Sequence, residues 1–439
     1  MGVIDRSLNK IQTLICHKYA NVMGMTKDAN LKGNEFSWMA TAFFLPFAVA
    51  EIPQGILLQR YPVPRVLGVN VMLWGVTVAC TAACSSFGAL LAVRIILGAL
   101  EAVISPALVL ITSTWYQRAE SSSRYGIWYC GLGGGQIIGG LLSFAFQHII
   151  VSSFEGWRVM FVVVGILNMV IGFGVVFYLP IKPQETSFLS EEEKVIVLAR
   201  LAINLDGMQD KTTKRSQVLD AFGDPQIWLL CLVTIFCALP SGIITTFSAT
   251  LIRNFGYNSK QAALLNIPSG FVSILSTMFA MTVVARGFSR WLSIVALVIP
   301  VIIGGALMSF LDKRNQGGLL TGIYLINCIT PILAVVYSWV GTNIAGYTKK
   351  ITANGMIAAA FAIANVIGPQ TFQAHDVPQY ILAKITILVV SVLAVISAVL
   401  LRVLLGFHNK GKDIMPGHLD EFVSSDITDK ENKRFRYMY

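Results

Sequence analysis

Long apolar segments, separated by shorter polar ones, run through almost the whole chain. A helix of about 20 apolar residues spans a lipid bilayer, and it satisfies its own backbone hydrogen bonds there. The pattern therefore predicts eleven membrane-spanning helices, at residues 36–58, 66–86, 88–111, 126–149, 158–179, 226–250, 262–284, 290–311, 317–340, 354–371 and 380–406.

One long polar stretch, residues 180–225, leaves five of these segments before it and six after it. Within it, Ser190 followed by Glu193 matches a capping box, so part of the stretch is expected to form an amphipathic helix. The expected organisation is an N-terminal helical bundle (1–179), a linker (180–225), a C-terminal helical bundle (226–406) and a polar tail (407–439).

Two short motifs recur, once in each bundle. Residues 50–55, AEIPQG, are echoed 215 residues later by residues 265–270, LNIPSG. Residues 136–140, QIIGG, are echoed 229 residues later by residues 365–369, NVIGP. Two echoes at nearly one offset indicate two repeated halves. Parallel halves of this kind form transporters, whose binding site lies between them near the middle of the membrane.

The composition excludes a soluble globular protein. Charged residues make up 13% of the 439 positions and hydrophobic residues 55%, whereas soluble domains carry about 25% charged residues. The net charge of +10 does not indicate a nucleic-acid partner, because no run of Lys and Arg alternates with aromatic residues outside the spans.

The basic residues are unevenly distributed between the two sets of loops. The linker, the tail and the loops on the same side hold 21 of the 33 Lys and Arg residues, against 11 on the opposite side. Membrane proteins keep their basic residues in cytoplasmic loops. The linker and the tail are therefore predicted to be cytoplasmic.

Motifs for metal, nucleotide or catalytic chemistry are absent from the sequence. The seven Cys residues show neither metal-ligand spacing nor a disulfide framework. The glycine-rich run at residues 131–140 fits no nucleotide-binding motif in any register, and such small residues are typical of close contacts between membrane helices. No metal, cofactor or enzymatic activity is expected. The polar exception in the run, Gln136, is a candidate substrate-binding residue.

Two ionisable residues, Arg94 and Glu101, lie inside one apolar segment, where each costs about 3 kcal/mol. Seven residues advance a helix by about 700° and 10.5 Å, so both side chains leave the same face. Arg94 is a candidate to bind an anionic substrate, because a guanidinium pairs with a carboxylate and keeps its charge. Glu101 is a candidate proton carrier, since burial favours the protonated carboxylic acid while a nearby cation opposes it. Polar contacts that hold the bundle together are the alternative role for both.

A second acidic candidate for proton coupling is Glu51, which stands with Gln54 beside Pro53. A helix kink at Pro53 exposes backbone N–H and C=O groups to a cavity, or serves as a structural hinge. The two roles are equally compatible with the sequence.

The polar candidates of the second half are amides, namely Asn343, Asn354 and Asn365. Asn354 and Asn365 lie eleven residues apart, about 20° beyond three helical turns, and so share a helix face. Amides hydrogen-bond a carboxylate or a ureide, but between membrane helices they also serve as packing contacts.

Several motifs resemble those of the major facilitator superfamily. They begin with residues 156–158, GWR, and Leu179-Pro180, at the two ends of the fifth segment. More specific are SWVGTNIAGYTKK at 338–350, ANVIGPQTF at 364–372 and DITDKENKRFRY at 426–437. Together they resemble the fungal anion:cation symporter family, whose members include allantoate, nicotinate and pantothenate permeases. The resemblance extends over nearly the whole chain from about Tyr19.

The resemblance implies twelve helices in two six-helix bundles, cytoplasmic termini, and import of small organic anions with protons by alternating access. It places Arg94 and Glu101 at polar positions of the family's fourth helix. The loop at residues 55–65 keeps the basic residues of the superfamily's signature loop and lacks its Asp.

The sequence departs from the family at its beginning. Residues 4–7, IDRS, resemble the end of the family's first helix, yet only three residues precede them and Leu8–Lys18 has no counterpart. We expect Leu8–Lys18 to be translated intron and the true start to lie upstream, which sequencing of the full-length transcript tests. If the chain begins as written, we expect the first helix to be truncated and one wall of the site to be missing.

The sequence thus predicts an all-α, multi-pass protein of the plasma membrane that imports a small organic anion, such as nicotinate, pantothenate or allantoate, together with protons. The expected partners are this anion, protons and the lipid bilayer, and the expected state is a monomer. Two alternatives stay open. One is an exporter of a secondary metabolite, because this scaffold runs in either direction, and the other is an inactive or sensor-like truncated transporter.

Overall fold

The computed structural model describes residues 16–116, 118–148, 155–181, 186, 190–197, 214–312, 314–373, 376, 380–413, 427–432 and 435–439. This part of the chain is helical and contains no β-strand. Most of the segment that departs from the family, Leu8–Lys18, lies outside the described residues. Its last three residues begin the short helix α2 (Cys16–Met23).

Within the described residues, eleven helices are long and apolar enough to cross a membrane, which confirms the predicted number. In the N-terminal half they are α4 (Glu35–Arg60), α5 (Val63–Thr81), α6 with α7 (Phe87–Glu101 and Ile104–Trp115), α8 (Arg118–Phe146) and α9 (Gly156–Tyr178). In the C-terminal half they are α12 (Pro225–Asn254), α13 with α14 (Ser259–Leu265 and Ile267–Ala285), α15 (Arg290–Phe310), α16 with η3 and α17 (Gln316–Ile326, Asn327–Ile329 and Ile332–Asn343), α18 (Tyr347–Gln370) and α19 (Ile381–Asp413).

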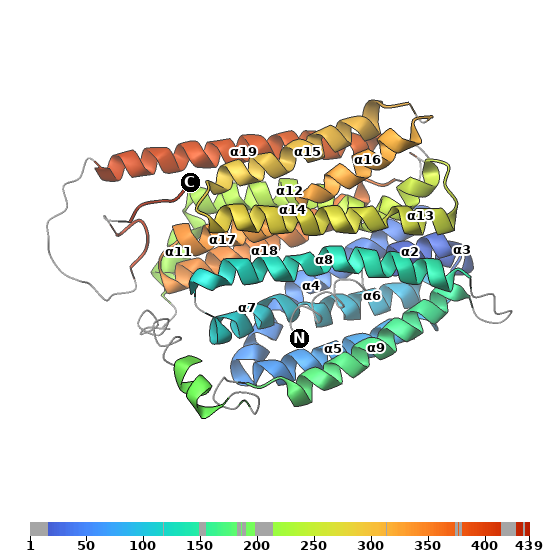
Figure 1. Ribbon diagram of the computed structural model, residues 1–439, viewed down its shortest axis with the longest axis horizontal. Coiled ribbons are helices and arrows are strands. Elements are labelled where there is room, and N and C mark those ends of the chain that lie inside the picture. Colours follow the sequence, from blue (N-terminus) through green and yellow to red (C-terminus); the bar gives the residue numbers. More distant parts are fainter. Residues whose placement is uncertain are drawn as a thin grey trace.

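The helices run side by side along the long axis of the molecule, and their connections gather at its two ends (Figure 1). One end holds the α7–α8 connection, the C-terminal end of α19 and the helix α11 (Arg215–Phe222), which lies near the end of the linker. The other end holds α13 and the short helix α3 (Met25–Asp28). We name these the cytoplasmic end and the outer end, after the distribution of basic residues.

The capping box predicted in the linker is present. The backbone N–H of Ser190 donates to the Glu193 carboxylate at 2.9 Å, and the N–H of Glu193 donates to the Ser190 hydroxyl at 3.2 Å. The helix that it begins covers residues 191–197. Two backbone donors that a helix start leaves unsatisfied are therefore paired.

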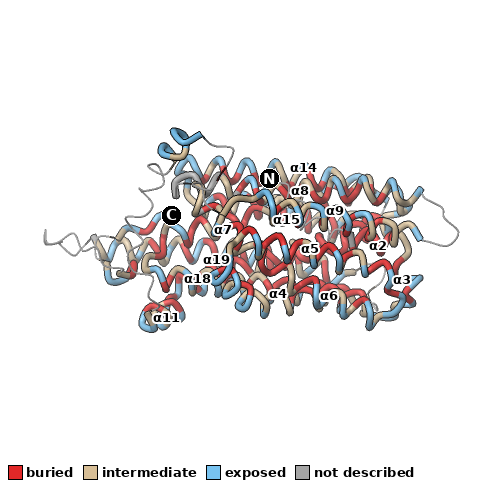
Figure 2. The backbone as a smooth tube through the Cα atoms, turned by 90° about the horizontal axis from the view of Figure 1, so that it is seen from below, coloured by how far each residue is buried: buried red, intermediate tan, exposed pale blue. Residues whose placement is uncertain are grey.

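Buried residues face the interior of the bundle and exposed residues its outside (Figure 2). Many of the exposed residues, like the buried ones, are apolar. Phe173 and Phe177 on α9 are 55% and 67% exposed, whereas Trp74 and Trp339, at contacts between helices, are at most 1% exposed. A soluble protein rarely exposes an apolar surface of this extent. The outer surface therefore faces lipid, as expected for a multi-pass membrane protein.

Two helix pairs, α8 with α14 and α4 with α18, join the N-terminal half to the C-terminal half. Gly133 and Gly270 meet where α8 crosses α14, and a Cβ on either glycine would lie 2.5 Å from the carbonyl oxygen of the other. The backbones can approach this closely only because neither residue carries a side chain. The glycine-rich run of α8 is therefore a helix contact, as its sequence predicts.

Hydrogen bonds tie α4 to α18 near the outer end. The Thr41 hydroxyl donates to the carbonyl of Val366 at 3.1 Å and accepts from the Gln370 amide at 2.8 Å. One turn closer to the outer end, the Ser37 hydroxyl donates to the carbonyl of Phe372 at 3.1 Å. The two halves are thus in direct contact at the outer end in this conformation.

The helix α2 also bridges the halves, because it packs against α8 and α9 on one side and α12 on the other. Its fully buried Lys18 donates to the hydroxyl of Ser248 at 3.1 Å, and Asn21 donates to the hydroxyl of Thr250 at 3.1 Å. These contacts lie in the outer half of α12.

The sequence echoes fall at equivalent places in the two halves. AEIPQG lies in α4 and LNIPSG at the α13–α14 junction, while QIIGG lies in α8 and NVIGP in α18. In each pair the second helix is the sixth membrane-spanning helix after the first. This spacing is the one that two repeated six-helix halves require.

Candidate functional site

Three of the membrane-spanning helices are interrupted, and two of these hold equivalent places in the two halves. The helix that begins as α6 breaks after Glu101 and resumes as α7, and the helix that begins as α16 breaks at η3 and resumes as α17. They are the third and the ninth of the eleven spans. Interrupted helices at corresponding positions of two halves are the best structural indication of a transport site.

Each interruption has a proline as its local cause. Pro106 and Pro331 lack an N–H to donate, and their rings crowd the carbonyl four residues earlier, at Ala102 and Asn327. The breaks lie at those carbonyls, where residues 102–103 and 330–331 form turns. The two prolines thus interrupt both helices within their membrane-spanning segments.

A cavity of about 100 Å³ lies between the halves at the level of these breaks. The N-terminal half contributes residues of α4, α6, α7 and α8, and the C-terminal half contributes residues of α12, α17 and α18 and the η3–α17 junction. Much of the lining is aromatic, with the rings of Phe43, Phe44, Phe47, Tyr129, Tyr337 and Phe361. This is a typical composition for a pocket that takes a small molecule.

Two carboxylates line this cavity, and both were candidates from the sequence. Glu101, at the break after α6, is 5% exposed, and Glu51 on α4 is half-buried. Among the described residues that line the cavity there is no Lys, Arg or His.

Several of the hydroxyl and amide hydrogens around the cavity are already used within the helices. Thr234, Thr245 and Thr330 donate to the backbone carbonyls of Leu230, Ser241 and Asn327 at 2.6–2.8 Å. The amide N–H of Asn365 likewise donates to the carbonyl of Phe361 at 2.8 Å. These side chains therefore present mainly oxygen atoms to the cavity.

Of the candidate amides, Asn365 lines the cavity and Gln136 lines a smaller one of about 10 Å³ beside it. Gln136 is 2% exposed and donates to the Asn327 amide oxygen at 3.3 Å, across the boundary between the halves. Its backbone carbonyl accepts from the Tyr19 hydroxyl at 3.3 Å. Asn365 and Gln136 hold equivalent positions in the two sequence echoes.

Arg94 is buried, at 2% exposure, two turns before Glu101 on the same face of α6. That face also carries Leu97 and Gly98, so the spacing of Arg94 and Glu101 predicted their common face correctly. Glu101 reaches the cavity, whereas Arg94 lies beyond the residues that line it.

The structure does not bring Asn343 or Asn354 to the cavity. Asn343 is fully buried at the end of α17, where its amide group donates to the carbonyl of Met438 and accepts from the N–H of Met438, both at 2.7 Å. Asn354 is half-buried on α18, outside the lining. Gln54 donates to Asn70 at 2.8 Å and is not among the residues that line the cavity.

The sequence reasoning missed the aromatic and hydroxyl residues of the lining. Ser105 follows the break in the third span, and Ser241 and Thr245 lie one turn apart on α12. Serine, threonine and phenylalanine are common throughout membrane helices, so no composition signal separates these from their neighbours. Pro106 and Pro331 lie close to the breaks, but prolines also occur inside α4, α12, α15 and α18, which stay continuous, so proline alone does not locate these residues.

No group of three His, Cys, Asp or Glu side chains in the described residues could hold a metal ion. The functional groups that line the cavity are therefore carboxylates, hydroxyl oxygens and aromatic rings. Such a set can bind a small organic molecule and exchange protons with it.

Comparisons with known proteins agree with this architecture. The model of the Major Facilitator Superfamily matches residues 18–369. The chain is 32% identical over 424 residues to the thiamine pathway transporter of Saccharomyces cerevisiae, covering 96% of this chain and 81% of that protein. It is 30% identical over 441 residues to the allantoate permease of the same yeast, covering 95% and 80%.

The fold is also that of a solved transporter structure. A bacterial homolog of the human lysosomal transporter Spinster, in an inward-facing and unoccupied conformation, superposes with a TM-score of 0.64 at 17% identity. The match covers 92% of this chain and 96% of that one. With its two halves, its interrupted helices and the cavity between them, the chain belongs to the major facilitator superfamily of membrane transporters, which carry small organic substrates.

Proposed function

We propose that this transporter imports a small organic anion across the plasma membrane together with protons, as a member of the fungal anion:cation symporter family. The observation that carries the proposal is the charge of the cavity: Glu51 and Glu101 line it, with no basic residue among the described lining. The resemblance to the allantoate permease supports an anionic substrate. The monomer is the proposed functional unit, because each chain contains both halves of the cavity.

The two glutamates provide a physical basis for coupling. An ionised glutamate and a bound anion about 5 Å apart, at an effective dielectric constant of about 20, repel each other by about 3 kcal/mol. Protonation of one glutamate therefore strengthens binding of an anion by roughly 100-fold. The anion enters the cavity effectively only with a proton, and its release into the less acidic cytoplasm accompanies loss of that proton.

Substrate contacts are assigned to Gln136 and Asn365, and Arg94 is assigned an electrostatic role from outside the lining. Asn365 lines the cavity and Gln136 lines the smaller cavity beside it. Arg94, buried two turns from Glu101, offers a fixed positive charge near that end of the cavity. Asn343 and Asn354 are left out of the assignment because they lie outside the lining.

Alternating access requires the halves to separate at the end where they now touch. The bonds from Thr41 to α18 and from Ser37 to Phe372, just after α18, would break when the outer end opens, while the α8–α14 contact serves as the pivot. Each hydrogen bond contributes about 1 kcal/mol, which a modest difference in binding energy can overcome.

Uptake of labelled nicotinate, pantothenate and allantoate at outside pH 5 and pH 7 tests the proposal. We expect uptake of one of these acids to be faster at pH 5. In Glu101→Gln and Glu51→Gln, which mimic the protonated state, this pH dependence should be reduced. Uptake of an acid at equal rates at the two pH values would contradict proton coupling.

A small organic cation is a second candidate substrate, and the same cavity gives the reason. Its carboxylates, its acceptor oxygens and its six aromatic rings suit a positively charged group, through ion pairs and cation–π contacts. The two candidates respond oppositely to protons. Cation uptake would be slower at pH 5 and weakened by Glu101→Gln, so the same assay with choline and thiamine distinguishes them.

A further inference from the structure

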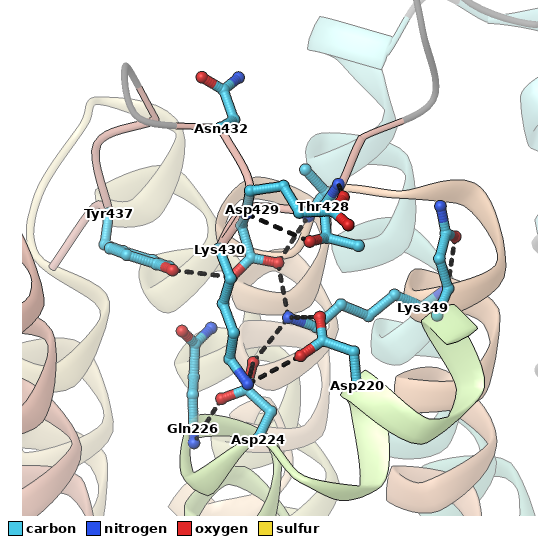
Figure 3. Close-up of polar contacts among 12 residues, drawn as sticks. Asp220, Asp224, Gln226, Lys349, Thr428, Asp429, Lys430, Asn432 and Tyr437 are labelled. Atoms are coloured by element: carbon cyan, nitrogen blue, oxygen red, sulfur yellow. Dashed lines mark hydrogen bonds and ion pairs between the residues drawn. The ribbon is translucent and has the colours of Figure 1, made fainter. Parts of the chain in front are cut away.

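The C-terminal tail folds back onto the cytoplasmic end of the C-terminal half. We name the described part of it, residues 427–432 and 435–439, the tail strap. At the centre of its docking site lies Lys349, the third residue of α18, whose side chain is fully buried (Figure 3). Its ammonium group contacts the carboxylates of Asp220, Asp224 and Asp429 at 2.9, 2.7 and 2.9 Å.

These carboxylates come from three separate elements. Asp220 lies in α11, Asp224 caps the start of α12 by accepting from the N–H of Gln226, and Asp429 belongs to the tail strap. A second lysine, Lys430 of the strap, contacts Asp220 at 2.8 Å from the solvent side. Lys349 therefore joins the starts of α12 and α18 to the tail through one buried charge.

The end of the tail strap makes a second anchor. Asn343, at the end of α17, holds the backbone of Met438 by two hydrogen bonds of 2.7 Å. The N–H of Arg290, the first residue of α15, donates to the carbonyl of Tyr439 at 2.8 Å, and Asn409 of α19 donates to the carbonyl of Tyr437 at 2.9 Å. The strap thereby reaches the cytoplasmic ends of α15, α17 and α19.

The two anchors are connected within the strap. The Tyr437 hydroxyl donates to Asp429 at 2.8 Å, on the side of the carboxylate opposite Lys349. Burial, and the negative charge of Asp429, raise the pKa of Tyr437, so its hydroxyl stays a donor at physiological pH. Lys412, near the end of α19, donates to the carbonyls of Asp429 and Asn432 at 2.6 and 3.0 Å.

We propose that Lys349 and the tail strap form a clamp that makes the cytoplasmic ends of the C-terminal half move as one rigid body during transport. Lys349 is a positioning residue in this clamp. It fixes the cytoplasmic end of α18, and Asn343 fixes that of α17, and both helices line the cavity farther along with Phe361, Asn365 and Tyr337.

The contacts of the clamp also indicate when it acts. The partners named above belong to α12, α15, α17, α18 and α19 of the C-terminal half, and to α11 at the end of the linker, which packs against α12 and α18. A rocking motion of one half against the other therefore breaks none of them. The strap stays docked throughout the transport cycle and differs in this from a gate, which has to open.

Hydrogen exchange of the full-length protein tests the clamp without any substrate. In Lys349→Met, the removal of the shared cation leaves three carboxylates together, and the strap should detach. We expect amide exchange at the starts of α12 and α18 and the end of α17 to rise at least tenfold. Lys410→Met, which changes an exposed lysine of the same cytoplasmic end, is the matched control and should leave exchange unchanged.

Where Lys349→Met fails to fold, Asp429→Asn carries the same test, because it weakens the link between the strap and Lys349 while leaving Asp220 and Asp224 in place. If amide hydrogen exchange in the variant that folds is as slow as in the unmodified protein, the proposal is wrong. Because this measurement needs no transported molecule, it remains decisive even if anion import proves wrong.

A cross-link distinguishes a clamp from a gate. In a background without the native cysteines, Asp220→Cys and Lys430→Cys are joined by a short bifunctional thiol reagent, with a monofunctional reagent on the same variant as control. We expect uptake of labelled nicotinate, or of whichever acid the unmodified protein takes up, to stay within twofold of the control. Loss of uptake on cross-linking would show that the strap has to release and would refute the clamp.

Kinetics separate positioning from substrate contact. Because Lys349 does not line the cavity, Asp429→Asn and Lys349→Met should lower the maximal uptake rate at least fivefold and change KM by less than twofold. A variant in which KM alone rises would place Lys349 in substrate binding and contradict the proposal.

Discussion

The contact between Gly133 of α8 and Gly270 of α14 joins the two halves, and Gly133→Ala perturbs it with one methyl group. The added Cβ would lie 2.5 Å from the Gly270 carbonyl oxygen and 2.6 Å from a side-chain carbon of Ile274. A carbon and an oxygen normally approach to about 3.3–3.6 Å. The helices therefore have to move apart by about 1 Å, because a backbone carbonyl cannot turn aside as a flexible side chain can.

The neighbouring residue is a control that differs in this one respect. A Cβ on Gly134 would meet nothing within 4 Å. Both substitutions gain the same helix propensity, up to about 1 kcal/mol, so the difference between them isolates the steric cost. Overpacking of this kind costs about 1–3 kcal/mol. Gly133→Ala should therefore lower the free energy of unfolding by that amount relative to Gly134→Ala.

The assay combines thermal unfolding of the purified protein with the initial rate of uptake. We expect Gly133→Ala to unfold at a lower temperature than Gly134→Ala and to transport more slowly, because the α8–α14 contact is the proposed pivot. If both variants unfold and transport alike, the close contact between the halves does not exist as described.

Three further predictions concern separate parts of the molecule. Arg94→Ala should abolish uptake, and persistent uptake would remove Arg94 from the substrate role. Thr41→Val removes two hydrogen bonds at the outer end, worth about 2 kcal/mol together, so a cysteine at Ser37 should react at least tenfold faster with an outside thiol reagent. Burial opposes ionisation of Asp220, but hydrogen bonds from Lys430 and Lys349 outweigh it and lower its pKa. Asp220→Asn should therefore destabilise the protein equally from pH 8 to about pH 5, and the difference should vanish as the pH falls below about 4.

The positions of the helices along the chain could be predicted because hydropathy and length respond directly to the bilayer. All eleven spans were found from apolar runs, and the basic loops assigned one end to the cytoplasm. The face shared by Arg94 and Glu101 followed from helical geometry alone, since rotation per residue is constant. The close approach at Gly133 followed from residue size.

The sequence could not show how far along a helix the cavity extends. Asn354 and Asn365 were predicted to share a face, yet the cavity reaches Asn365 and Ala358 and ends before Asn354. Asn343 was a candidate ligand because it is a polar residue at the end of a span. Its partner, Met438, lies 95 residues later in a segment with no hydropathy signal, so only the folded chain reveals the contact.

The central claim is that Glu51 and Glu101 couple transport to protons, and accumulation in proteoliposomes tests it most directly. With an acidic outside and no membrane potential, the unmodified transporter should concentrate the labelled acid inside. The double variant Glu51→Gln/Glu101→Gln should still exchange labelled for unlabelled acid but should not concentrate it. Accumulation by the double variant to the same level as the unmodified protein would contradict the account.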